Sequence, residues 1–213
     1  MSELCTVDGT ILNLIFQNEE NGYTVLRLVT GDGEVVTVVG TIPCAAPGES
    51  LVVDGQWMTH PVHGQQLQAL RVERHMPTAE ADILSYLSSG VVKGVGPATA
   101  EKLVGRFGEN TLRILEEEPE LLSRIKGITA RKAMEIGESY RAQAGMRRLL
   151  DFLAANDLPL HLGLRLYRRY GAGAMDALRD NPYLLVDECY GVDFAVMDEI
   201  ALSMGVAGDS RRR

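Results

Sequence analysis

The sequence has little of what marks an exported, membrane-bound or metal-binding protein. Its three cysteines, Cys5, Cys44 and Cys189, lie far apart without C-x-x-C spacing, which argues against a disulfide framework and a zinc site. No apolar run reaches the ~18 residues that suggest a membrane span, and the first residues lack a basic segment followed by an apolar one. We therefore expect a cytoplasmic protein with no metal site and no membrane partner.

Catalytic patterns are missing as well. No string fits the phosphate loop G-x-x-x-x-G-K-S/T, and no Ser/His/Asp, Cys/His or spaced acidic pair stands out. His60 and His63 have H-x-x-H spacing but no third ligand and no general-base glutamate, and Pro61 between them breaks a helix, so they are predicted to shape a turn. The chain is expected to have no catalytic residue and no cofactor of its own.

Charge is unevenly distributed along the chain. The net charge is −8, yet residues 1–75 carry −6 whereas residues 122–172 carry +6. A local basic surface can act on phosphates within a Debye length although the whole molecule is acidic. Nucleic-acid binding is therefore compatible with the composition.

The first 75 residues predict a small barrel. Short β-branched runs between Thr6 and Arg74 are separated by turn residues, as at Asn21-Gly22 and Pro47-Gly48. Five strands at this spacing favour closure into an OB-like β-barrel, because closure removes exposed edges. The barrel aromatics, Phe16, Tyr23 and Trp57, could stack bases, but the −6 charge favours a role in the core.

Beyond the linker at 74–81 the pattern becomes helical, which gives an α+β fold class. Apolar i, i+3, i+4 faces predict separate helices, punctuated by glycine and proline, over 81–89, 97–107, 110–117, 119–125, 129–142, 146–156, 158–170, 174–180 and 193–204. Residues 106–128 align with 169–192 at an offset of 63 residues, with one extra residue near the end. We predict three domains: a barrel (1–75), tandem helix-hairpin-helix units (76–144) and a degenerate second repeat (145–213).

The stretch VVKGVGPATAEKLVGRFG, residues 91–108, predicts a helix-hairpin-helix turn. A helix precedes its glycines, so a dinucleotide-binding loop, which follows a strand, is disfavoured. Glycines let backbone N–H groups approach a phosphate at a helix N-terminus, a contact with backbone rather than bases. The candidate DNA-binding residues of this turn are Lys93, Gly94, Val95, Gly96, Lys102 and Arg106. The alternative is a packing corner between two helices.

A second hairpin spans residues 125–136, and phosphate contact and packing remain equally open for it. Thr129 stands where a second glycine would, and its hydroxyl can cap the following helix. Its candidate DNA-binding residues are Lys126, Gly127, Thr129, Arg131 and Lys132. Two later hairpins, at 156–162 and 190–194, are interpreted as structural copies, although Arg165, Arg168 and Arg169 leave room for a backbone contact.

Several stretches together resemble the amino-terminal part of the RecD-like, superfamily 1 DNA helicases of the longer class that works outside RecBCD. They are residues 18–28, 57–67, 89–108, 181–186 and 190–206. The resemblance implies an accessory barrel and tandem hairpins ahead of an ATP-driven motor that moves 5′ to 3′ on single-stranded DNA, in repair or recombination. ATP and Mg²⁺ are implied for motor domains of the same polypeptide. Because the motor's phosphate loops are absent, the chain is expected to be an amino-terminal fragment.

Two other interpretations stay open. A barrel followed by two hairpins is also the architecture of RuvA, which binds Holliday junctions, although Thr129 replaces a glycine and a 63-residue repeat takes the place of RuvA's small terminal domain. The chain could instead be a protein-interaction module with vestigial hairpins, which the acidic barrel supports. The expected partners are therefore DNA, single-stranded or junction, and the motor domains, and a protein partner for the barrel is left open.

Overall fold

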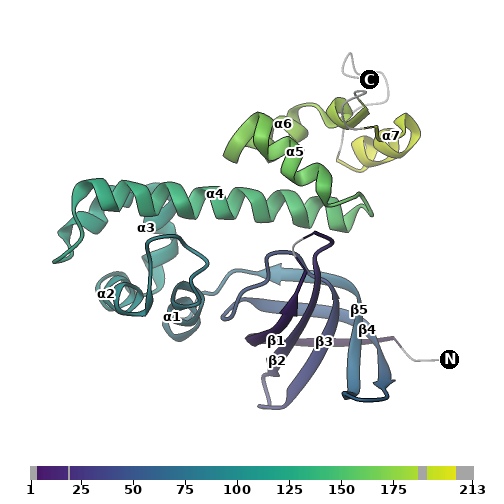
Figure 1. The fold of residues 1–213 in the computed structure, drawn as a ribbon, viewed down its shortest axis with the longest axis horizontal. Helices are drawn as coiled ribbons and strands as arrows, with labels where there is room; N and C mark the ends of the chain where they lie inside the picture. The colour runs from purple at the N-terminus through teal and green to yellow at the C-terminus, as the bar shows by residue number, and fades with distance from the viewer. Residues whose placement is uncertain (1–3, 19, 187–190, 205–213) are drawn as a thin grey trace. The chain divides into compact units, whose positions relative to one another are not determined.

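The computed structural model describes residues 4–18, 20–186 and 191–204. The chain divides into two compact units, Met1–Gln143 and Ala144–Arg213. The first unit contains a barrel and two helical hairpins, and the second contains further helices (Figure 1). No helix in the described ranges is both long and apolar enough to cross a bilayer.

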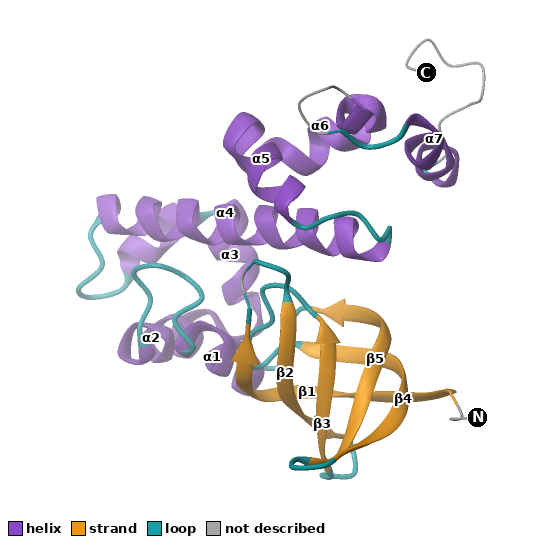
Figure 2. Ribbon diagram, turned by 45° about the vertical axis from the view of Figure 1, so that its right-hand side comes forward, coloured by secondary structure: helices purple, strands orange, loops and turns teal. Residues whose placement is uncertain are grey.

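The strands close into a barrel, as predicted, and their order in it is β1-β2-β3-β5-β4 (Figure 2). β1 pairs antiparallel with both β2 and β4, and β3 pairs parallel with β5, which leaves no long open edge. The elements are β1 (Leu4–Gln17), β2 (Tyr23–Thr30), β3 (Val35–Thr41), β4 (Ser50–His60) and β5 (Gly64–His75).

Aliphatic side chains fill the barrel. Alternate residues of each strand point inward, so the β-branched and leucine positions of the sequence meet in one core. The buried set includes Ile11, Leu26, Leu28, Val38, Leu51, Val53 and Leu67. This core is complete without aromatic side chains.

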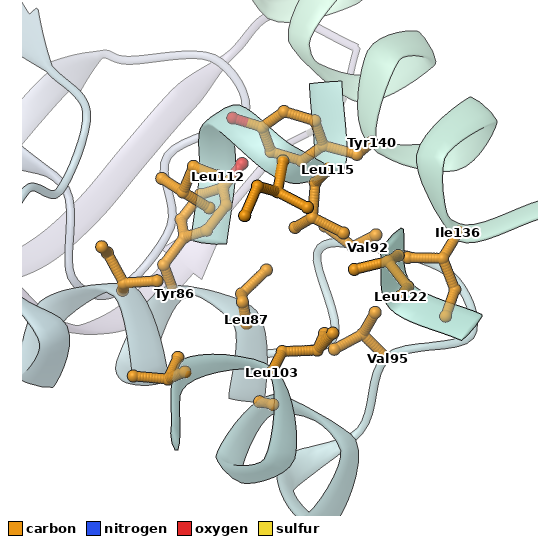
Figure 3. Close-up of a cluster of buried hydrophobic side chains, with 14 of the residues drawn as sticks. Tyr86, Leu87, Val92, Val95, Leu103, Leu112, Leu115, Leu122, Ile136 and Tyr140 are labelled. Atoms are coloured by element: carbon orange, nitrogen blue, oxygen red, sulfur yellow. The ribbon is translucent and has the colours of Figure 1, made fainter. Parts of the chain in front are cut away.

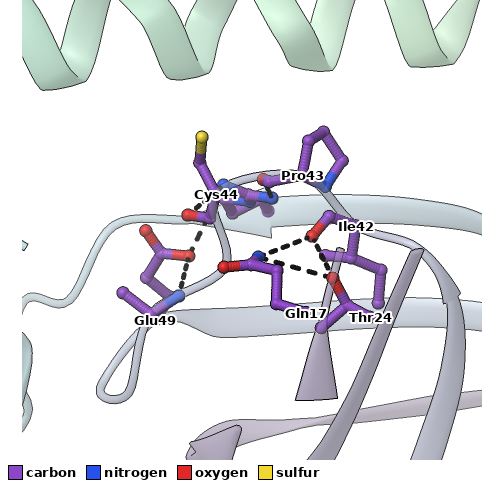
Figure 4. Close-up of polar contacts among 8 residues, drawn as sticks. Gln17, Thr24, Ile42, Pro43, Cys44 and Glu49 are labelled. Atoms are coloured by element: carbon purple, nitrogen blue, oxygen red, sulfur yellow. Dashed lines mark hydrogen bonds and ion pairs between the residues drawn. The ribbon is translucent and has the colours of Figure 1, made fainter. Parts of the chain in front are cut away.

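A cluster of polar contacts stabilises the loop between β3 and β4 (Figure 4). Glu49 is fully buried, accepts a hydrogen bond from the Ala46 amide at 3.3 Å and lies 3.6 Å from the Arg74 guanidinium. Arg74 also donates to the Pro43 carbonyl at 2.7 Å. A buried carboxylate with these partners fixes the loop, since an uncompensated buried charge would be strongly destabilising.

The tandem hairpins of the first unit follow the barrel. Their elements are α1 (Glu80–Ser88), α2 (Pro97–Phe107), η1 (Gly108–Asn110), α3 (Thr111–Glu117), η2 (Pro119–Arg124) and the first part of α4 (Ala130–Ala155). Side chains of these helices meet in one apolar cluster that includes Tyr86, Leu103, Leu115, Leu122 and Ile136 (Figure 3). The cluster positions both hairpin turns.

The second unit repeats this order of elements. It contains the end of α4, α5 (His161–Tyr170), η3 (Gly171–Gly173), α6 (Ala174–Asp180), η4 (Pro182–Val186) and α7 (Phe194–Ser203). The glycines after α2 and α5, Gly108 and Gly171, have nearly equal φ and ψ, 55° and −135° against 59° and −142°. The 63-residue offset of the sequence is therefore an offset between equivalent structural positions.

Two helix predictions were wrong. The helices expected over 129–142 and 146–156 are one helix, α4, of 26 residues. Gly145, taken as a break, lies inside it, and a Cβ there would come within 3.1 Å of the Ala172 carbonyl oxygen, so this glycine permits close packing. In the range 119–125, expected to be α-helical, Pro119–Arg124 form the 3-10 helix η2 and Ile125 has an extended backbone.

Candidate nucleic-acid interface

Two buried valines anchor the first hairpin turn in the apolar core. Val92 and Val95 are 1% and 4% exposed and lie in the apolar cluster of Figure 3. The Val95 amide donates to the Val92 carbonyl at 3.1 Å, and the Lys93 amide donates to the Ser139 hydroxyl at 2.9 Å. These bonds satisfy the inward-facing amides of the turn.

The remaining amides of this turn are unused. Within the part of the chain that the structure describes, the N–H groups of Gly94, Gly96 and Ala98 donate no hydrogen bond. Gly94 has φ +88°, which favours glycine, whereas Gly96 is extended, and a Cβ on Gly96 would have no neighbour within 4 Å. Unpaired donors at an open helix N-terminus suit an anion.

The second turn repeats this geometry 33 residues later. The Ile128 amide donates to the Ile125 carbonyl at 3.0 Å, and Gly127 has φ +95°. The Thr129 hydroxyl accepts from the Lys132 amide at 3.2 Å and caps α4, as predicted. The second turn thus offers a similar backbone arrangement with one side-chain cap added.

A basic groove joins α2 to the second turn. It is open, measures about 680 Å³, and is lined by Lys102, Gly105, Arg106, Arg124, Ile125, Lys126 and Gly127. The four cations are exposed, and none of them has a carboxylate partner among the described residues. Since no acidic side chain lines the groove, its charge is uniformly positive. Such a surface attracts phosphates.

The structure brings some of the predicted residues together and separates others. Lys102, Arg106, Lys126 and Gly127 meet in the groove. Lys93, Gly94 and Gly96 lie at the first turn outside the lining, and the Val95 side chain is buried in the core.

The two cations at the start of α4 are also outside the groove lining. Arg131 donates to the Glu135 carboxylate at 2.8 Å, and this bond holds the pKa of Arg131 above its usual range. Lys132 is half-buried. The exposed ion pair screens part of the Arg131 charge, so the four groove cations are better placed than Arg131 to meet an anion.

Three lining residues of the groove were not among the predicted site residues: Gly105, Arg124 and Ile125. Arg124 ends η2, in a segment that was expected to be an α-helix. Gly105 lies inside α2, where a Cβ would meet nothing within 4 Å. A glycine inside a helix costs about 1 kcal/mol, so a glycine within a helical pattern is a sequence signal of a packing or functional role.

The turns of the second unit differ from those of the first in the groups that they offer to an anion. Asp157, with φ +54°, takes the position of Gly94, but its amide is bound to the Ala154 carbonyl at 3.2 Å. Pro159, in place of Gly96, has no N–H. In the last turn the Asp193 carboxylate accepts from the Ala195 amide at 2.8 Å. Carboxylates at both turns repel an anion.

The barrel aromatics correct a prediction. Phe16, Tyr23 and Trp57 were expected in the core but are 51%, 43% and 41% exposed, and the rings of Phe16 and Tyr23 lie 6.5 Å apart. A register shift between Leu14 and Phe16 changes the side of the strand on which Phe16 lies.

The two histidines form a turn, as predicted. His60 Nδ1 accepts from the amides of Val62 and His63, each at 3.2 Å, and the two imidazole rings stack at 4.7 Å. No group of three metal-ligating side chains occurs among the described residues.

Two family models match the chain. The model described as "ATP-dependent DNA helicase YrrC, OB-fold domain" matches residues 4–77, which form the barrel. The model described as "ATP-dependent RecD2 DNA helicase HHH domain" matches residues 142–213, which include the second helical unit. The chain has the domains of the amino-terminal region of a RecD-like DNA helicase. The predicted α+β fold class and the predicted resemblance are thereby confirmed.

A curated relative supports the same assignment. The ATP-dependent RecD2 DNA helicase of Deinococcus radiodurans is 28% identical to this chain in an alignment that covers 97% of the chain. The same alignment covers 30% of the length of that helicase. The crystal structure of the S. pombe Stn1-ten1 complex is 21% identical over 33% of this chain and 56% of that one, with a TM-score of 0.28. That likeness is too weak to carry an argument.

Proposed function

We propose that this RecD-like region binds DNA through its phosphate backbone, without reading base sequence, as an accessory part of a helicase. One observation carries the proposal: four exposed cations line one groove beside a glycine turn, with no acidic residue among them. Phosphate contacts position a protein on nucleic acid but carry no sequence information. The unused backbone amides of Gly94 and Gly96 are neutral hydrogen-bond donors that can also bind phosphate oxygens.

The groove suits a chain of phosphates better than a single anion. Lys102 and Arg106 lie one helical turn apart on α2, and Arg124 and Lys126 face them from the second turn, so the charges are spread along the groove. Arginine donates in a planar fork that matches phosphate oxygens, and lysine adds a compact charge. Successive phosphates of a nucleic-acid strand lying along the groove can each contact one of these cations.

The resemblance supports a further proposal about the whole polypeptide. Motor domains, with ATP and Mg²⁺, would move 5′ to 3′ on single-stranded DNA in the cytoplasm during repair or recombination. No phosphate loop occurs in this chain, so no residue named here is assigned to ATP. The groove would hold DNA near the motor.

The barrel fits a protein partner better than DNA. It carries a net charge of −6, and its exposed aromatics, Phe16 and Tyr23, form a pair on the surface. The negative charge of the barrel repels DNA and so opposes base stacking on its aromatics. The same charge would attract a basic, partly apolar protein surface. Replacing both aromatics with serine should leave the DNA affinity of the chain unchanged, and a loss of affinity would place DNA on the barrel.

Binding of labelled oligonucleotides, followed by fluorescence anisotropy, tests the proposed function. The ligands are two single strands of unlike sequence and a four-way junction, each titrated at several salt concentrations. We expect similar affinities for the two strands and a steep loss with salt. Arg106→Gln with Arg124→Gln should weaken all binding, whereas Arg113→Gln, on an exposed residue already paired with Glu117 and Glu118, should not.

Two results would contradict the proposal. Salt-independent binding, or an affinity that changes tenfold or more between the two strands, would exclude a backbone contact. A strong preference for the junction would favour the RuvA-like alternative instead.

A further inference from the structure

The second unit keeps the basic helix of the first although its turns have changed. α2 and α5 end at equivalent glycines, so the 63-residue offset places Arg165 where Lys102 stands and Arg169 where Arg106 stands. The position of Gly105 becomes a third cation, Arg168. Thus the two cationic positions of α2 that line the groove of the first unit are cationic again in α5.

These arginines share one face of α5. They stand at i, i+3 and i+4 and are exposed, whereas Leu162, Gly163 and Leu166 of the same helix are buried. The Arg169 guanidinium lies over the Tyr170 ring, 5.4 Å from its centroid. Stacking on the ring adds a cation–π contact to the guanidinium, which stays positively charged.

The stretch of sequence that contains this face is also basic. Residues 158–175 contain no aspartate or glutamate, so the local charge is +3 with histidine neutral. The acidic residues Asp157 and Asp193 lie at the hairpin turns instead, where the first unit has glycine and threonine. The turns of the second unit thus carry negative charge that repels phosphate, whereas α5 has one more cation than the equivalent stretch of α2.

We propose that the Arg165, Arg168 and Arg169 face of α5 is a second contact for the phosphate backbone of DNA, separate from the groove of the first unit. It rests on the proposed function, because charge complementarity selects the same polyanion. The contact differs in kind: helix side chains make it, without the turn amides that the first unit offers. The second unit is then a DNA contact in its own right and more than a structural copy.

The test uses the whole chain and a labelled single-stranded oligothymidylate long enough to reach beyond one groove. The slope of log K against log salt concentration is measured for the wild type and for Arg165→Gln/Arg168→Gln/Arg169→Gln. Each lost phosphate contact should make the slope shallower by about 0.7, so the triple variant should lose up to about 2. Arg179→Gln is the matched control, since Arg179 is exposed on α6 and its equivalent in the first unit is Glu116.

A single substitution controls for a change of fold in the triple variant. Arg165 and Arg169 take part in interactions within the protein, so Arg168→Gln is measured alone, with circular dichroism as a check on helix content. It should make the slope shallower by about 0.7 and leave the helix content unchanged.

The outcomes separate this inference from the proposed function. If Arg106→Gln/Arg124→Gln weakens binding while the α5 variants keep the wild-type slope, the inference is wrong and the proposed function stands. If the wild type does not bind at low salt, both are wrong. If the α5 variants bind DNA normally but abolish a self-association seen by sedimentation, the face holds the acidic surface of a second copy, and the inference is overturned.

Discussion

The Lys102 ammonium lies 4.0 Å from the point that a Cβ on Gly127 would occupy. The helix that follows the first turn therefore places a cation beside the glycine of the second turn. This contact makes the two hairpins one surface, to which both contribute cations.

The two glycines of the first turn should behave differently when each is replaced with alanine. Gly94→Ala should lower the free energy of unfolding by about 1–2 kcal/mol, because φ is +88° there. Gly96→Ala should leave stability unchanged or raise it by up to about 1 kcal/mol, since its backbone is extended and a Cβ meets nothing. Gly96→Ala should nevertheless weaken DNA binding, because the methyl group stands where a phosphate would approach.

Urea unfolding and anisotropy on the same preparation check both effects. If Gly96→Ala binds as tightly as the wild type, the first turn is only a packing corner.

Two helix glycines form a second matched pair. A Cβ on Gly137 would lie 2.5 Å from the Pro119 Cβ and 3.2 Å from the Leu115 carbonyl oxygen, so Gly137→Ala should cost about 1–3 kcal/mol. Gly105 has no neighbour at that position, and Gly105→Ala should raise the free energy of unfolding by about 1 kcal/mol through helix propensity. Opposite shifts of the thermal midpoint are expected, and a loss of stability in both variants would show that Gly105 is packed.

The cap of α4 gives a third prediction. Thr129→Ala removes the acceptor for the Lys132 amide and should lower the free energy of unfolding by about 1 kcal/mol. Thr129→Ser keeps the hydroxyl and should retain most of the stability. Equal losses in the two variants, measured by urea unfolding, would mean that the methyl group and not the hydroxyl of Thr129 matters.

The sequence predicted the elements whose signals are local. Turn residues such as Asn21-Gly22 separate the strands, and glycines mark the hairpin turns, so both the barrel and the helical region could be predicted. The 63-residue offset between the repeats could also be read directly, because equivalent helices carry equivalent apolar residues.

The errors arose where contacts distant in the sequence decide the outcome. Gly145 looked like a helix break, but its role depends on Ala172. The side of the strand that Phe16 occupies depends on a register shift in the pairing of β1 with β2, which no composition reveals. Arg124 is part of the groove only because the fold brings the end of η2 to the same groove as Lys102 and Arg106 of α2. A cation becomes part of a site through packing, so its sequence neighbours do not show it.

The salt dependence of binding with Arg124→Gln tests most directly whether the groove holds the phosphate backbone. Arg124 lines the groove, and the sequence did not predict it as a site residue. The variant should keep the unfolding midpoint of the wild type, because the side chain is exposed, while the slope of log K against log salt concentration for a single-stranded oligonucleotide becomes shallower by about 0.7. A slope equal to that of the wild type, in folded protein, would contradict phosphate binding in the groove.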